Sequence, residues 1–162
     1  MTTEELYDKL KLIQKMKCET QNLELKSAEQ GYPKRLYDSL SSFSNQDDGG
    51  IIVFGIDEKQ DYKEVGVYDV QDIQKKINEQ CLQMNPVVRP LITVVEKENK
   101  KFVSAEIPGI DLADRPCYYQ GRGRLKGSYT RIGDSDEPMT EYEIYSYEAY
   151  RRKYQDLSLI HI

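Results

Sequence analysis

The spacing of hydrophobic residues along this chain predicts both helices and strands. Spacings of three and four residues predict helices over residues 2–17, from Pro33 to about Phe43, and from Asp69 to about Met84. Short apolar or alternating runs predict strands at Leu23–Lys26, Ile51–Ile56, Val65–Val67, Leu91–Glu96, Phe102–Ile107 and Tyr129–Ile132. This order of elements predicts an α+β fold with a mixed, mainly antiparallel sheet flanked by helices.

The run Ile51–Ile56 is almost continuously apolar, which is typical of a central strand covered on both faces. We expect the helices that start near Pro33 and Asp69 to flank it. The polar segment Lys97–Lys101 lies between two predicted strands and predicts a β-hairpin.

Two capping-box patterns mark the first and last helices. Thr2 with Glu5 starts the first helix, and Thr140 with Glu143 starts a last helix that runs to about Lys153. The length of 162 residues fits one domain. We expect an N-terminal helix over residues 1–18, a main domain over 19–153, and a tail over 154–162 that is non-native or truncated from a longer protein.

Composition excludes several functional classes. No apolar run approaches the roughly 20 residues of a membrane helix, so no membrane partner is expected. Three widely spaced cysteines suit reduced thiols and predict a cytoplasmic location. His161, the one histidine, lies in the tail, which argues against histidine-based catalysis.

A local basic segment stands out against a net charge of −5, which itself argues against a globally basic surface. The segment from Arg115 to Gly133 holds five cations, no acids and several tyrosines. The residues concerned are Arg115, Tyr118, Tyr119, Arg122, Arg124, Lys126, Tyr129 and Arg131. Cations suit phosphates and aromatic rings suit unstacked bases, so the segment favours nucleic-acid binding over a solvated hairpin.

Acidic residues follow or flank two predicted strands. If Leu23–Lys26 lies beside Ile51–Ile56, then Glu19, Glu24 and Asp57 would approach one another, with Glu58 as a substitute for Asp57. Such carboxylates either hold a divalent cation, Mg²⁺ or Mn²⁺, or are solvated strand ends. The pattern leaves both alternatives open.

The loop before the central strand contains Asn45, Gly49 and Gly50. These residues either form a nest of backbone N–H groups for a phosphate or only turn the chain from a helix into a strand. No Gly-x-x-x-x-Gly-Lys-Ser/Thr pattern is present, so nucleotide hydrolysis of the P-loop kind lacks its motif.

Seven short motifs occur in an order that resembles the Schlafen/AlbA-type DNA-binding domain, also described as a divergent AAA domain. They are Glu24-Leu25-Lys26, Ser42–Asn45, Gly49-Gly50, Phe54–Asp57, Val65–Val67, Arg115–Tyr119 and Ser128–Gly133. The resemblance covers about residues 19 to 150. It implies a bacterial transcriptional regulator or helicase-like protein, with DNA or RNA as its partner.

A related domain of the vertebrate Schlafens is an endoribonuclease with two glutamates five residues apart and an acid after the buried strand. The resemblance carries these roles to Glu19, Glu24 and Asp57 or Glu58, with Mg²⁺ or Mn²⁺ as cofactor. Leu25 departs from the aromatic residue usual in that motif. The vertebrate enzyme also joins two lobes, so a homodimer would have to supply the second lobe here.

Three hypotheses follow from the sequence. The leading one is a nucleic-acid-binding module, a transcriptional regulator or an RNA- or DNA-processing domain. The second is a metal-dependent endoribonuclease with a three-carboxylate site. The third is a dimerisation or regulatory domain of a longer protein.

Overall fold

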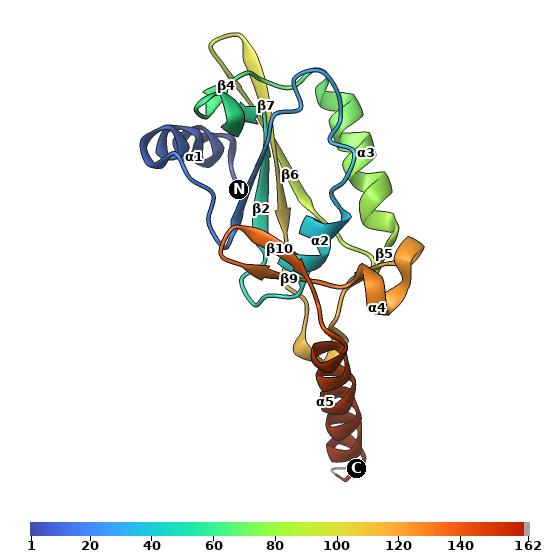
Figure 1. Ribbon diagram of the computed structural model, residues 1–162. Coiled ribbons are helices and arrows are strands. Elements are labelled where there is room, and N and C mark those ends of the chain that lie inside the picture. The colour runs from blue at the N-terminus through green and yellow to red at the C-terminus, as the bar shows by residue number, and fades with distance from the viewer. Residues whose placement is uncertain (161–162) are drawn as a thin grey trace.

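A four-stranded mixed sheet forms the centre of the molecule (Figure 1). The computed structural model describes the backbone of residues 1–160 and the side chains of residues 1–156. The strands are β1 (Leu23–Lys26), β2 (Gly50–Phe54), β6 (Leu91–Lys97) and β7 (Lys100–Ile107), in the order β1-β2-β7-β6. β1 and β2 are parallel, whereas β2–β7 and β6–β7 are antiparallel. The predicted α+β fold with a mainly antiparallel sheet is therefore confirmed.

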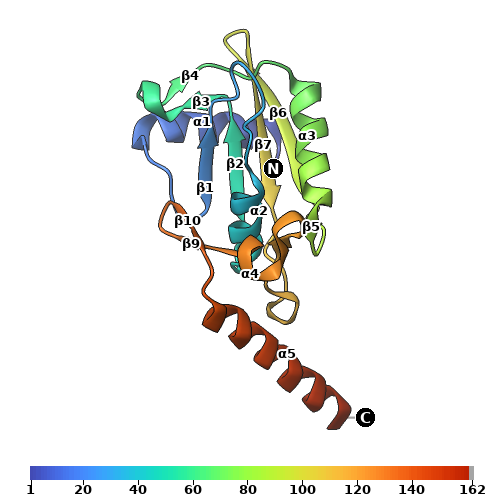
Figure 2. The same cartoon turned by 45° about the vertical axis from the view of Figure 1, so that its right-hand side comes forward.

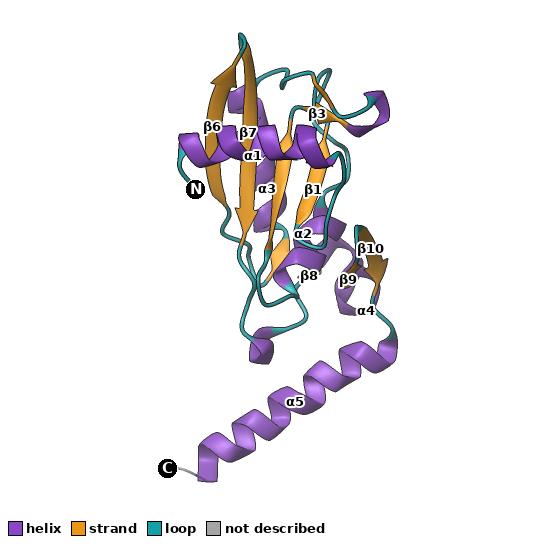
Figure 3. Ribbon diagram, turned by 90° about the vertical axis from the view of Figure 1, so that its left-hand side faces the viewer, coloured by secondary structure: helices purple, strands orange, loops and turns teal. Residues whose placement is uncertain are grey.

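Helices cover both faces of this sheet. α1 (Thr3–Met16) lies on one face, and α2 (Tyr37–Ser44) and α3 (Val70–Leu82) lie on the other (Figures 1 and 3). In β2, Val53 packs with the α1 cluster and Phe54 with the α2–α3 cluster, and neither side chain is exposed. The prediction of a strand covered on both faces is confirmed.

Shorter elements connect the sheet to a second hairpin. They are β3 (Ile56–Asp57), η1 (Glu58–Gln60), β4 (Lys63–Glu64), β5 (Met84–Asn85), η2 (Leu112–Asp114), β8 (Tyr118–Tyr119), η3 (Gln120–Arg122), α4 (Gly123–Gly127), β9 (Tyr129–Ile132) and β10 (Ser135–Pro138). β9 and β10 pair in antiparallel fashion, and their hairpin packs beside α2 and β1 (Figure 2). β8 pairs with β5, which places Tyr119 next to the end of α3.

The last helix, α5 (Glu141–Ile160), projects away from the rest of the molecule (Figure 2). Its capping box is present, because Thr140 and Glu143 exchange hydrogen bonds. The helix continues past Lys153 into the segment expected to be a tail. His161 lies outside the described residues. No helix in the described part of the chain is both long and apolar enough to cross a membrane.

Several predicted boundaries were wrong. The second helix begins at Tyr37 rather than at Pro33, and the predicted strand Val65–Val67 is replaced by β4, because Gly66 has φ +75° and leaves the extended conformation. The hairpin turn has two residues, Glu98 and Asn99, both with positive φ, which is the turn geometry that best matches twisted strands.

Candidate functional site

Arg131 lies at the centre of a buried charge network between β1, α2 and the β9–β10 hairpin. Its side chain is 0% exposed. One terminal nitrogen donates to Glu24 at 2.6 Å and to Asp136 at 3.0 Å, and the other donates to the carbonyl oxygens of Thr20 and Leu23. The expected contact between Arg131 and a phosphate therefore has no support, because the guanidinium faces the interior.

The positive charge of Arg131 is balanced by the carboxylates of Glu24 and Asp136. Burial alone would lower the pKa of Arg131, but hydrogen bonds from its guanidinium to Glu24 and Asp136 raise that pKa above the usual value. Asp136 also accepts hydrogen bonds from the hydroxyls of Ser39 and Ser42 in α2. A paired and hydrogen-bonded charge of this kind is tolerated inside a protein, and it joins the hairpin to the sheet.

The predicted carboxylate set of Glu19, Glu24 and Asp57 is not assembled in the described residues. Glu24 faces Arg131, and its second oxygen lies 3.3 Å from the Lys26 ammonium. Asp57 caps η1 by accepting from the Lys59 backbone N–H at 3.0 Å and from the Gln60 side chain. No three His, Cys, Asp or Glu side chains within the described range are grouped to hold a metal ion. Glu58, the substitute for Asp57, and Glu24 both lie near Glu19, although these acids do not form a metal-binding group in the described residues.

Glu19 lies at the open edge of β1, where it accepts a hydrogen bond from the Leu25 backbone N–H at 2.9 Å. Burial raises the pKa of its carboxyl from 4.5 to about 8. The Leu25 hydrogen bond lowers that pKa, whereas the nearby Glu24 and Glu58 carboxylates raise it. The structure thus brings Glu19 near Glu24 and Glu58, but it favours a protonated Glu19 at neutral pH.

The segment that leads from α2 into β2 packs inside the molecule through three buried residues, Asn45, Gly49 and Gly50. The Asn45 amide donates to the carbonyl oxygens of Cys117 and Tyr129 and accepts from the Cys117 N–H. An added Cβ at Gly50 would lie 2.3 Å from the Phe43 ring. The geometry of this loop supports a turn from a helix into a strand rather than a nest of backbone N–H groups that binds a phosphate.

The basic segment divides into buried and exposed residues. Arg115 is buried and donates to the Ile110 carbonyl and to Asp47, and Tyr129 is also buried. Arg122 and Lys126 are exposed, and neither forms an ion pair within the described range. Arg124 is half-buried, lies 5.6 Å from the Tyr118 ring and pairs with Glu148 at 2.9 Å. Only the exposed part of the segment is available to a ligand.

Two guanidinium groups from distant parts of the chain meet at one phenol. Arg35 and Arg122 both donate to the Tyr129 hydroxyl, at 2.9 and 3.2 Å. Arg35 is 52% exposed and lies 3.5 Å from Asp38. Sequence reasoning missed Arg35, because it lies outside the basic segment; the pair Lys34-Arg35 just before a helix was the available signal.

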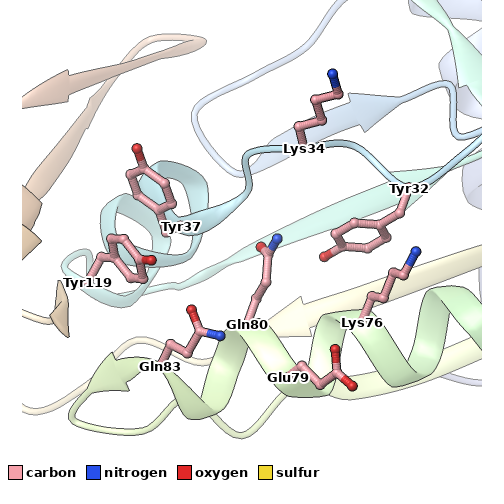
Figure 4. A pocket seen from close by; sticks show the side chains of 8 residues that line it. All are labelled: Tyr32, Lys34, Tyr37, Lys76, Glu79, Gln80, Gln83 and Tyr119. Atoms are coloured by element: carbon pink, nitrogen blue, oxygen red, sulfur yellow. The ribbon is translucent and has the colours of Figure 1, made fainter. Parts of the chain in front are cut away.

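An aromatic pair lies next to these cations. The Tyr37 and Tyr119 rings stack with centroids 4.3 Å apart, and the Arg35 guanidinium lies 5.0 Å from the Tyr37 ring. Beyond the two rings is a pocket of about 360 Å³ between α2 and α3 (Figure 4). The stacking partner of Tyr119 is therefore Tyr37, a residue that the sequence analysis did not name.

The family model described as Schlafen, AlbA_2 matches residues 19–140, which is more than half of the chain. The chain belongs to this family. The resemblance noted from the sequence motifs is thereby confirmed. No curated protein matches the chain.

Two solved structures share the AlbA_2 fold of this chain. One is the solution structure of the N-terminal domain of a protein from Nitrosomonas europaea that is named as related to the ATP-dependent DNA helicase RecG. It is 26% identical, with a TM-score of 0.62, and the match covers 82% of this chain and 92% of that one. The other is the DIP2311 protein from Corynebacterium diphtheriae, which is 18% identical with a TM-score of 0.53, over 79% of this chain and 24% of that one.

Proposed function

We propose that this AlbA_2 domain binds nucleic acid through a basic surface formed by Arg35, Arg122, Arg124 and Lys126. The observation that carries the proposal is the convergence of Arg35 and Arg122 on the Tyr129 hydroxyl. Tyr129 is buried, so its position fixes where both guanidinium groups meet.

The convergence favours an anion at this point. Two positive groups close together repel each other, and a phenol oxygen carries no charge to offset them. Asp38 offsets Arg35 in part, but Arg122 has no carboxylate partner among the described residues. A phosphate oxygen pair accepts forked hydrogen bonds from guanidinium groups and would supply the missing negative charge.

The family and its structural neighbour support a role connected with nucleic acid. The N. europaea domain comes from a protein named as related to a DNA helicase, and it is similar to this chain over most of its length. Because the whole chain carries a net charge of −5, binding depends on this local surface rather than on the overall charge.

The proposal is tested by fluorescence anisotropy with labelled single strands and duplexes of RNA and DNA over a range of salt. Affinity should fall steeply with salt, because phosphate binding releases counterions. In Arg35→Ala/Arg122→Ala, two lost phosphate contacts should reduce the slope of log K against log salt by about 1.4 on a single strand.

Lys11→Ala/Lys15→Ala is the matched control. It removes the same charge from α1, on the opposite face of the sheet, and should leave the slope unchanged. Equal slopes in both double variants would contradict the proposal, as would the absence of any salt-dependent binding.

The ribonuclease alternative has less support from the structure. Its carboxylates would have to converge, and Glu24 is instead held by Arg131 and Lys26. We therefore expect that MnCl₂ produces no cleavage of a labelled RNA. Manganese-dependent cleavage that disappears in Glu24→Gln would restore this alternative.

A further inference from the structure

The pocket beside the basic surface has fixed walls. Tyr32 and Lys34 come from the segment before α2, Tyr37 from α2, Gln80 from α3 and Tyr119 from β8 (Figure 4). Pairing between β5 and β8 and a hydrogen bond from the Gln120 N–H to the Gln83 carbonyl hold the Tyr119 wall against the end of α3. Its volume of about 360 Å³ is near the lower end of the range for small-molecule sites, which suits a ligand of about one nucleotide.

Two polar atoms in these walls are buried without a hydrogen-bond partner among the described residues. They are the Tyr32 hydroxyl and the Gln80 Oε1 atom. Figure 4 shows the Tyr32 hydroxyl pointing across the pocket toward Gln80. Buried polar groups in native proteins are almost always paired, so an unpaired donor and acceptor facing one pocket indicate a polar ligand.

The unpaired atoms define the ligand's chemistry. Gln80 Oε1 accepts a hydrogen bond, and the Tyr32 hydroxyl can donate one; burial raises the pKa of Tyr32, which keeps the hydroxyl protonated. A base edge that carries a donor beside an acceptor complements this pair, as do the amino group and ring nitrogen of adenine or cytosine and the N3–H and O4 of thymine or uracil. Lys34, Lys76 and Glu79 also line the pocket, and the stacked pair Tyr37–Tyr119 provides an aromatic wall for a flat base.

The pocket is continuous with the basic surface through Tyr37. This side chain lines the pocket, and the Arg35 guanidinium lies 5.0 Å from its ring. A strand whose phosphate lies between Arg35 and Arg122 therefore has its neighbouring base next to the pocket. A paired base cannot enter, because its donor and acceptor edge is already hydrogen-bonded and its faces are stacked.

We propose that this pocket takes one unstacked base of a single-stranded nucleic acid. The inference rests on the proposed nucleic-acid-binding function and adds to it a preference for single strands over duplexes.

The test measures binding of short fluorescent oligo(dA) and oligo(dT) strands of equal length and of an oligo(dA)·oligo(dT) duplex. The wild type should bind both single strands more tightly than the duplex. Tyr32→Phe and Gln80→Met, which keep the side-chain shape, should each weaken binding of the single strands about fivefold and leave duplex binding unchanged. Tyr7→Phe, on α1, is the matched control and should change neither.

Thermal unfolding of the free variants supplies a second readout. Because each substitution removes an unpaired buried polar atom, Tyr32→Phe and Gln80→Met should melt at the wild-type temperature or above it. A clear loss of stability together with unchanged binding would show that these atoms serve the fold and would overturn the inference.

The outcomes separate this inference from the proposed function. Salt-dependent binding with equal affinity for oligo(dA), oligo(dT) and duplex would overturn the base pocket and leave the basic surface in place. If no strand binds, the proposed function fails as well. If adenosine monophosphate binds as tightly as oligo(dA), the base belongs to a free nucleotide, and the assignment to a strand is overturned.

Discussion

Arg131 holds the β9–β10 hairpin against β1 and α2 through Glu24 and Asp136. Arg131→Met would leave Asp136 buried without its counter-ion and would leave Glu24 with Lys26 alone. Loss of one partner of a buried ion pair destabilises proteins by about 3–5 kcal/mol, and we expect a loss of this size in urea unfolding. Arg122→Met, at an exposed position of the same segment, is the control and should stay within about 0.5 kcal/mol of the wild type. Equal effects of the two substitutions would contradict the structural role of Arg131.

Glu19 should make the stability of the domain depend on pH. Its carboxyl pKa is raised from 4.5 to about 8 in the folded state, so folding favours the protonated form. Stability from this group is fully present below about pH 4.5 and is lost as the pH rises through 8. Since Glu19 is only partly buried, solvent screening reduces the effect to about 1 kcal/mol.

Glu19→Gln keeps the acceptor for the Leu25 N–H and removes the titration. The variant should therefore be more stable than the wild type above pH 8 and should lose the decline in stability between pH 4.5 and 8. Chemical unfolding at a series of pH values measures this. An unchanged pH profile in the variant would show that Glu19 is ionised in the folded protein.

Single residues of the site could be predicted from sequence only in part. A run of cations without acids marks a basic segment, and of its residues Arg122, Arg124 and Lys126 are exposed or half-buried. Sequence does not show which cations turn inward, and Glu24, one of the two acids that pair with Arg131, lies far away along the chain. Arg35 was missed because it lies far from Arg122 in the sequence, and the two residues come together only in the folded structure.

At the scale of elements, the start of β2 depends on a glycine that has no positive φ angle. Gly50 faces Phe43, and a Cβ there would lie 2.3 Å from the ring. Gly50→Ala should destabilise the domain by about 1–3 kcal/mol, because Phe43 must leave its packed position. Gly31→Ala, where a Cβ would meet nothing within 4 Å, is the control. Equal melting temperatures for the two variants would contradict this packing.

Elements with a hydrophobic pattern of their own were predictable, whereas several short elements without one were not. α1, β1, α3 and the β6–β7 hairpin follow local hydrophobic periodicity, so their types are readable from the sequence. β5, β8 and β10 have between two and four residues and exist because a distant strand pairs with them. Such pairing leaves no periodic signal, and the walls of the pocket, which include β8, were therefore not foreseen.

At the scale of the whole molecule, the sheet separates two surfaces of different character. α1 covers one face, while the basic surface and the pocket lie on the face covered by α2 and α3. The cations of the basic surface come from the segment before α2 and from η3 and α4. The central claim is that nucleic acid binds there.

Amide chemical-shift mapping by NMR, with a short single-stranded oligonucleotide titrated into the domain, tests this claim most directly. The account predicts that the largest shifts fall at residues 32–37 and 119–126, with smaller ones along α3 near Gln80 and none along α1. Shifts centred on α1 or on the edge near Glu19 and Glu58, or no shifts at any residue, would contradict it.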